Sequence, residues 1–136
     1  MNIKQNKSYS DIKIMVADDA NLTLDLINKY LRDIGCSNML NALNGVDAVQ
    51  LYKAKHPDLV LLDIFMPVKN GLKALNDILE FDADAYVVIV SGDSTLDRTQ
   101  DALKAGAKGF LPKPYNRAKI QEVLEQYLST INRPPE

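Results

Sequence analysis

The sequence has few of the residues that mark specialised classes of protein. Its 136 residues include a single cysteine, Cys36, and no tryptophan. One cysteine excludes an internal disulfide and suits a reducing compartment, where it most often acts as a small buried hydrophobic side chain. No apolar run approaches the roughly 20 residues needed to cross a bilayer, and the polar start, MNIKQNKSYS, lacks the apolar segment of a signal peptide. We therefore expect a cytoplasmic protein without membrane insertion.

An excess of charge of either sign is also missing. There are 16 basic and 18 acidic residues, and the basic ones are scattered along the chain. A nucleic-acid binder usually carries a basic stripe that neutralises phosphates, so direct contact with nucleic acid is not expected. Hydrophobic residues at 46% and charged residues at 25% are typical of a globular protein, and the length suits one domain.

What the sequence does contain is a regular alternation of short apolar runs and amphipathic stretches. The expected strands are residues 12–17, 39–43, 58–63, 86–91 and 108–111, and the expected helices are residues 22–34, 45–55, 71–79, 96–105 and 116–128. Two of the strands, 58–63 and 86–91, are apolar without alternation, as in parallel strands covered on both faces. The pattern predicts an α/β domain at residues 11–130, after a flexible arm (1–10) and before a tail or the start of a linker (131–136).

Polar side chains collect where these strands end: Asp18 and Asp19 after the first, Asp63 on the third, Ser91 on the fourth and Lys113 just past the fifth. Each has an ordinary explanation as a turn residue, a helix cap or a surface charge. Those explanations do not account for acids, a hydroxyl and an amine at successive strand ends. In open α/β sheets, ligands bind outside the carboxyl ends of the strands, so we expect one site at this edge.

The residue types at this edge suggest the chemistry. Three carboxylates repel one another, and a hard divalent cation relieves the repulsion. Oxygen ligands without histidine or cysteine suit Mg²⁺ or Ca²⁺ better than zinc, and few carboxylates favour Mg²⁺, which also binds phosphate oxygens. Phosphoryl transfer needs mainly positioning and charge neutralisation. In that chemistry the metal would bridge Asp63 and the incoming group, with Lys113 as a second positive charge and Ser91 as a hydrogen-bond partner.

Four segments then match a known family: residues 16–19 (VADD), 59–67 (LVLLDIFMP), 90–92 (VSG) and 105–114 (AGAKGFLPKP). Together, and in this order, they resemble the CheY-like response-regulator receiver domain of two-component signal transduction, over about residues 11–128. The resemblance implies a flavodoxin-like, doubly wound fold with five helices and a five-stranded parallel sheet in the order 2-1-3-4-5.

The resemblance also implies roles for individual residues. Asp63 would be the phospho-acceptor, and Asp18, Asp19, Asp63 and the backbone carbonyl of Phe65 would hold Mg²⁺. The family often has a small or polar side chain at the position of Phe65. A bulky ring there would shield the acyl phosphate from water, so we expect a phosphotransfer acceptor with at most slow self-dephosphorylation.

Further residues are implied in sensing the phosphoryl group. Ser91 and Lys113 would bind its oxygens, and Ser91 and Phe110 would form the switch that alters the surface of the fourth helix, fifth strand and fifth helix. Phe110 lacks the hydroxyl of the commoner tyrosine and so offers no hydrogen bond to a partner. The bond between Lys113 and Pro114 would be a cis peptide.

The resemblance implies partners as well. A sensor histidine kinase or histidine phosphotransfer protein would donate the phosphoryl group, and a downstream protein or a fused output domain would respond. The chain would then be a single-domain response regulator or a phosphorelay carrier. The resemblance is also compatible with a homodimer that forms on phosphorylation. The sequence names neither the kinase nor the target.

Other functions fit less well. A haloacid-dehalogenase-like phosphatase also uses an aspartate nucleophile at a strand end, but it needs an acid two residues later, where this chain has Phe65. A nucleotide-binding module lacks its glycine-rich motif. An interaction domain that had lost phosphorylation would lack one of the aspartates or the lysine. His56, which precedes Pro57, is interpreted as a surface loop residue and not as a phosphodonor.

Overall fold

The computed structural model describes residues 7–92 and 96–132. Its strands are β1 (Lys13–Ala17), β2 (Asn38–Ala42), β3 (Leu59–Asp63), β4 (Val87–Ser91) and β5 (Gly109–Pro112). Its α-helices are α1 (Asn21–Ile34), α2 (Gly45–Lys55), α3 (Gly71–Phe81), α4 (Leu96–Lys104) and α5 (Arg117–Ile131), and a short 3₁₀ helix, η1 (Tyr9–Asp11), precedes β1. The expected elements are all present, with ends that differ by up to three residues.

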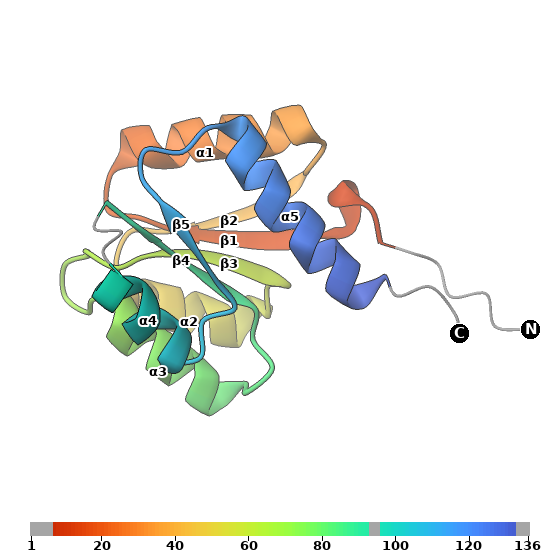
Figure 1. Ribbon diagram of the computed structural model, residues 1–136. Helices are drawn as coiled ribbons and strands as arrows, with labels where there is room; N and C mark the ends of the chain where they lie inside the picture. The colour runs from red at the N-terminus through yellow and green to blue at the C-terminus, as the bar shows by residue number, and fades with distance from the viewer. Residues whose placement is uncertain (1–6, 93–95, 133–136) are drawn as a thin grey trace, which may run out of the picture.

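The strands form one parallel sheet in the order β2-β1-β3-β4-β5. Helices α1 and α5 cover one face, and α2, α3 and α4 cover the other (Figure 1). This is the doubly wound, flavodoxin-like arrangement that the resemblance implied. In the part of the chain that the structure describes, no helix has the length and apolar character required to span a membrane.

Each face of the sheet has its own hydrophobic core. Val60 and Leu62 of β3 belong to the core under α2–α4, while Leu59 and Leu61 belong to the core under α1 and α5. Alternate residues of a strand point to opposite faces, so a strand that is buried on both faces needs apolar residues at every position. This explains the continuous apolar run that the sequence shows at β3.

Asparagine side chains fix the starts of three helices. Asn44, Asn70 and Asn116 each accept a hydrogen bond from the backbone N–H three residues later, before α2, α3 and α5. Such caps satisfy one of the free N–H groups of the first helical turn. At the other end of α1, Gly35 adopts a φ of 125°, a conformation that suits glycine as the residue ending a helix.

Residues 7–10 of the expected N-terminal arm make contacts with the domain. The backbone N–H of Lys7 donates to Asn132 Oδ1 at 3.0 Å, and Asn132 Nδ2 donates back to the Lys7 carbonyl at 2.8 Å. Tyr9 packs against the core under α1 and α5, which also buries Cys36. The apolar ring of Tyr9 was overlooked in a segment interpreted as polar. Residues 1–6 and 133–136 lie outside the described residues.

Candidate functional site

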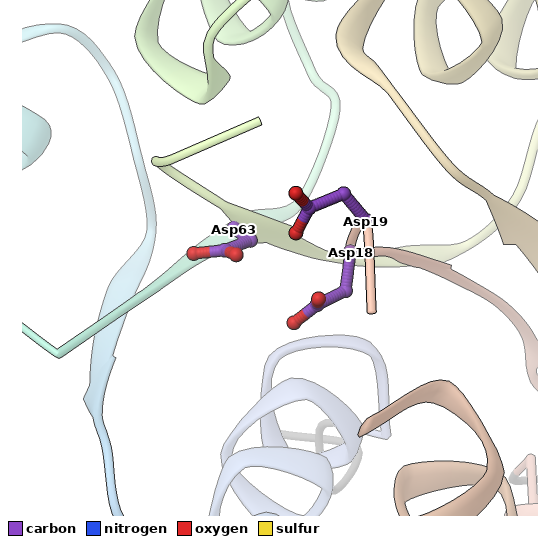
Figure 2. A group of neighbouring side chains, drawn as sticks. All are labelled: Asp18, Asp19 and Asp63. Atoms are coloured by element: carbon purple, nitrogen blue, oxygen red, sulfur yellow. The ribbon is translucent and has the colours of Figure 1, made fainter. Parts of the chain in front are cut away.

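Three aspartates gather at the carboxyl ends of β1 and β3 (Figure 2). Ala17 pairs with Leu62 in the parallel register, so the next residues, Asp18 and Asp63, emerge side by side. One carboxylate oxygen from each of Asp18, Asp19 and Asp63 lies within 4.8 Å of the others. Asp18 and Asp63 are only 2% and 5% exposed, whereas Asp19 is open to solvent. The group can therefore offer a cation buried ligands on one side and water on the other.

Lys113 brings a positive charge to these carboxylates. Its Nζ lies 3.2 Å from Asp18 Oδ2 and 3.4 Å from Asp63 Oδ2. The Lys113 backbone N–H donates to the carbonyl of Ser91 at 2.8 Å, which holds the end of β5 to that of β4. The peptide bond from Lys113 to Pro114 is cis, as the resemblance implied. One ammonium against three carboxylates leaves an excess of negative charge.

The surroundings of Asp63 disfavour the charged form of its carboxylate. Burial raises the pKa of Asp63, and the charge of Asp18 raises it further, against the opposing effects of Lys113 and of a hydrogen bond from the Phe65 backbone. For Lys113, desolvation acts to lower the pKa, but the charges of Asp63 and Asp18 outweigh it and the pKa is raised. A bound cation would lower the pKa of Asp63, because nearby positive charge favours the ionised carboxylate.

This pKa shift predicts how Asp63→Asn changes stability with pH. The pKa of Asp63 is higher in the folded protein than in the unfolded chain, where it is near 3.8. Ionised Asp63 therefore lowers the free energy of unfolding at pH values above the folded-state pKa. Well below pH 3.8 the carboxyl is protonated in both states, and this loss of stability disappears. In buffer with EDTA, we expect Asp63→Asn to increase the free energy of unfolding at pH 7. The gain should shrink as the pH falls towards 4.

Urea unfolding at several pH values measures this gain. Asp25→Asn, at an exposed position of α1, is the matched control for the loss of a carboxylate. A gain that increases as the pH falls would contradict the raised pKa of Asp63.

Sequence reasoning missed two residues after β3: Val68 in the loop and Gly71, the first residue of α3. The Lys69 N–H donates to the Pro67 carbonyl at 2.8 Å, and Val68 between them has a φ of 68°. This is a tight three-residue turn, and a β-branched residue in that conformation is strained. A Cβ built on Gly71 would lie 2.2 Å from the Asp63 carbonyl oxygen, so the start of α3 packs directly on the Asp63 backbone. The pair Asn70-Gly71 at a helix start was the available signal.

The remaining predicted residues occupy different places. Ser91 is fully buried at the end of β4. Phe110 is half-buried on β5 and packs against the core under α2–α4. Phe65 is 56% exposed, so its side chain is largely open to solvent. His56 caps the C-terminal end of α2 and is exposed, away from the strand ends that carry the aspartates, in agreement with its interpretation as a surface residue.

Comparison with known proteins identifies relatives of this chain. The family model "Response regulator receiver domain" matches residues 14–125. The chemotaxis protein CheY of Halobacterium salinarum is 32% identical over 117 residues, which cover 86% of this chain and 97% of that protein.

Solved structures agree in fold. The complex of CheX and CheY with BeF₃ and Mg²⁺ from Borrelia burgdorferi contains a chain with a TM-score of 0.81 and 30% identity, covering 90% of each chain. The receiver domain of a sensor histidine kinase from Pseudomonas aeruginosa, with a magnesium ion in its active-site cleft, has a TM-score of 0.79 over 87% of this chain and 98% of that one. At 22% identity, the second likeness concerns the fold alone.

Proposed function

Because this chain belongs to the response regulator receiver domain family of two-component signalling, we propose that it accepts a phosphoryl group on Asp63 and signals through the resulting change of its surface. The observation that carries the proposal is the geometry around Asp63: a buried carboxylate flanked by two further carboxylates, with an ammonium 3.4 Å away. Nothing in the site favours the haloacid-dehalogenase alternative, since Phe65 has no proton to give to a leaving group.

The donor set fits Mg²⁺. Three carboxylate oxygens close together, without histidine or sulfur, are ligands for a hard cation. Asp18, Asp19 and Asp63 would hold the ion together with the Phe65 carbonyl, and the exposed side at Asp19 leaves room for waters and phosphoryl oxygens. The complex of CheX and CheY from Borrelia burgdorferi, which contains a chain 30% identical to this one, was solved with Mg²⁺, which supports the choice of metal. When bound, Mg²⁺ supplies positive charge that offsets the charge developing on the transferred group.

The chemical step uses the carboxylate of Asp63 as nucleophile. One of its oxygens bonds to the phosphorus of a phosphohistidine donor while the phosphorus–nitrogen bond breaks and its electron pair returns to the imidazole. The products are an acyl phosphate on Asp63 and a neutral histidine, once the imidazole has its proton. Lys113 remains an ammonium through this step because its pKa is raised, and it pairs with the phosphoryl oxygens.

The response would pass through β4 and β5. The Ser91 hydroxyl lies at the end of β4, next in the sheet to β3, and would donate a hydrogen bond to a phosphoryl oxygen. Phe110, on the neighbouring strand and only half-buried, would then move further inward. The surface formed by α4, β5 and α5 would change, and a phosphorylated population would favour the state that a target protein binds. The donor would be a sensor histidine kinase or a histidine phosphotransfer protein in the cytoplasm.

Incubation with acetyl phosphate tests the proposal without knowledge of the donor. We expect intact-mass spectrometry to show one added phosphoryl group on the native protein in the presence of Mg²⁺, and none with EDTA or with Asp63→Asn. Asp25→Asn is the control for the loss of a surface carboxylate and should be phosphorylated normally. Equal labelling of Asp63→Asn and the native protein would show that the acceptor is another residue.

A second prediction concerns the lifetime of the phosphate. The Phe65 side chain, although 56% exposed, would shield one side of the acyl phosphate from water, and it has no group that could orient an attacking water. Phe65→Asn replaces it with a hydrogen-bonding amide, and we expect loss of phosphate to become about tenfold faster, equal to about 1.4 kcal/mol of activation free energy. Phosphate release after removal of acetyl phosphate measures the rate. Phe65→Leu is the apolar control, and equal rates for the asparagine variant and the native protein would contradict the role of the ring.

A further inference from the structure

The loop between β3 and α3 lies directly against the first residue of α2. A Cβ built on Gly45 would lie 2.0 Å from the carbonyl oxygen of Lys69, 2.7 Å from its carbonyl carbon and 2.8 Å from its Cβ. Atoms that are not bonded to each other do not approach so closely in a packed interior. Any side chain at position 45 would therefore require the loop or the helix to move.

The backbone conformation of Gly45 does not itself require glycine. Its φ lies outside the left-handed region, and its place at the start of α2 is one that alanine adopts without strain. Glycine in a helix is less favourable than alanine, so the helix gains nothing from it. What the missing side chain provides is space for the Lys69 carbonyl.

The start of α2 is the fixed side of this contact. The Asn44 side chain accepts a hydrogen bond from the Asp47 N–H at 2.8 Å and donates one to the Asp47 carboxylate at 3.1 Å. Ala48, in the next turn, is fully buried in the core under α2–α4. Val68 in the loop is exposed. A side chain added at position 45 would therefore displace the loop before it displaced the helix.

The loop is held in a conformation that neighbouring elements impose on it. Val68 has a φ of 68°, which a β-branched residue rarely takes, and strain of this kind persists where surrounding contacts determine the backbone. Those contacts act through Lys69, whose carbonyl meets Gly45 on α2 and whose ammonium pairs with Asp77 on α3. The Lys69 N–H also closes the turn with the Pro67 carbonyl. The turn is thus anchored to both helices.

The same loop begins with backbone groups that act at the metal site. The Phe65 N–H donates a hydrogen bond to the Asp63 carboxylate, and the Phe65 carbonyl is one of the ligands in the arrangement proposed for Mg²⁺. The residues on either side of Phe65, Ile64 and Met66, are buried. With its neighbours held in this way, the backbone of Phe65 takes up much of any displacement of the turn.

We propose that Gly45 is a positioning residue for the metal site: the space that it leaves lets Lys69 dock on α2, and this docking sets the Phe65 backbone relative to Asp63. The inference rests on the proposed function, since it concerns the same carboxylates and the same ion. Gly45 supplies no ligand of its own and acts through the loop.

Gly45→Ala tests the proposal in the full chain. We expect isothermal titration calorimetry to show Mg²⁺ binding weakened about tenfold, a usual effect of changing a residue that orients metal ligands. In metal-free buffer, the ¹H–¹⁵N NMR spectrum should show a shifted Phe65 amide, because its hydrogen bond to Asp63 changes. Leu31→Ala removes a fully buried side chain near the far end of α1. It is the matched control for lost stability and should bind Mg²⁺ normally.

Asp77→Asn removes the other anchor of Lys69 without adding atoms, and it covers the case in which Gly45→Ala does not fold. The ion pair is partly exposed, so we expect Mg²⁺ binding to weaken by only about twofold. The comparison is with Asp25→Asn, which removes an exposed carboxylate on α1.

The inference is overturned if Gly45→Ala binds Mg²⁺ as tightly as Leu31→Ala, or if it leaves the Phe65 amide unshifted in metal-free buffer. Should Gly45→Ala not fold, equal Mg²⁺ binding by Asp77→Asn and Asp25→Asn overturns it. Labelling of the native protein with acetyl phosphate is a separate readout. Its failure would contradict the proposed function, whereas the metal-free spectra and the Mg²⁺ titrations decide the role of Gly45.

Discussion

Replacing Asp18 with asparagine should weaken Mg²⁺ binding by about 100-fold or more, equal to about 2.7 kcal/mol. Asp18 is 2% exposed, so its charge is poorly screened, and removing one unit of charge next to a divalent ion at a few ångströms costs several kcal/mol at an effective dielectric constant of about 20. Asparagine keeps the size of the side chain, and its amide oxygen can still accept the hydrogen bond from the Ala20 N–H. The loss is therefore one of charge and not of folding.

Lys113 adds to the effect. In Asp18→Asn its ammonium keeps one of its two carboxylate partners, Asp63, and competes with the metal for it. Isothermal titration calorimetry with MgCl₂ measures the affinity, and Asp25→Asn is the control for lowering the net negative charge. If Asp18→Asn binds Mg²⁺ within about threefold of the native protein, Asp18 is not a ligand and the arrangement proposed for the site is wrong.

Gly71→Ala should lower the free energy of unfolding by about 3 kcal/mol, the upper end of the usual cost of overpacking. A Cβ at this position would lie 2.2 Å from the Asp63 carbonyl oxygen and 2.7 Å from Ile64 Cα. These are backbone atoms of β3 and its following loop, so they cannot rotate away as a side chain would. Relief requires movement of the start of α3, of the Asp63 backbone, or of both.

The same displacement should impair the site. Because the Gly71 N–H donates to the Ile64 carbonyl at 2.8 Å, shifting α3 also moves the segment that follows Asp63. We expect slower labelling by acetyl phosphate in the fraction that remains folded. Gly92→Ala is the matched control, since nothing lies within 4 Å of a Cβ there. Equal unfolding midpoints for the two variants, measured in urea, would show that the contact at Gly71 is not restrictive.

The fold class and the position of the site could be predicted from the sequence because both follow from short-range patterns. The run Leu59–Leu62 has no polar face, as expected of a parallel strand covered on both sides. Parallel strands end at one edge, so Asp18 and Asp63 had to meet once their strands were neighbours. That neighbour relation, and with it the strand order, came from the resemblance and not from periodicity.

What the sequence could not show depends on contacts through space. The approach of Gly71 to Asp63 is set by how α3 docks on β3, and a glycine after Asn70 is equally usual in a simple turn. The bonds between Lys7 and Asn132 join residues 125 positions apart. A cavity at the other end of the sheet is lined by residues from three separate segments, among them Asp58, Asp84 and Tyr127. No local sequence pattern links these segments.

The identity of the acceptor is the central claim, and chemical mapping of the phosphorylated residue tests it most directly. Borohydride reduces an acyl phosphate to an alcohol, which converts the acceptor aspartate into homoserine. After labelling with acetyl phosphate and Mg²⁺, reduction and proteolysis, tandem mass spectrometry should place homoserine at position 63 and leave Asp18 and Asp19 intact. Homoserine at position 18 or 19, or a phosphate on Ser91 that survives reduction, would contradict the account.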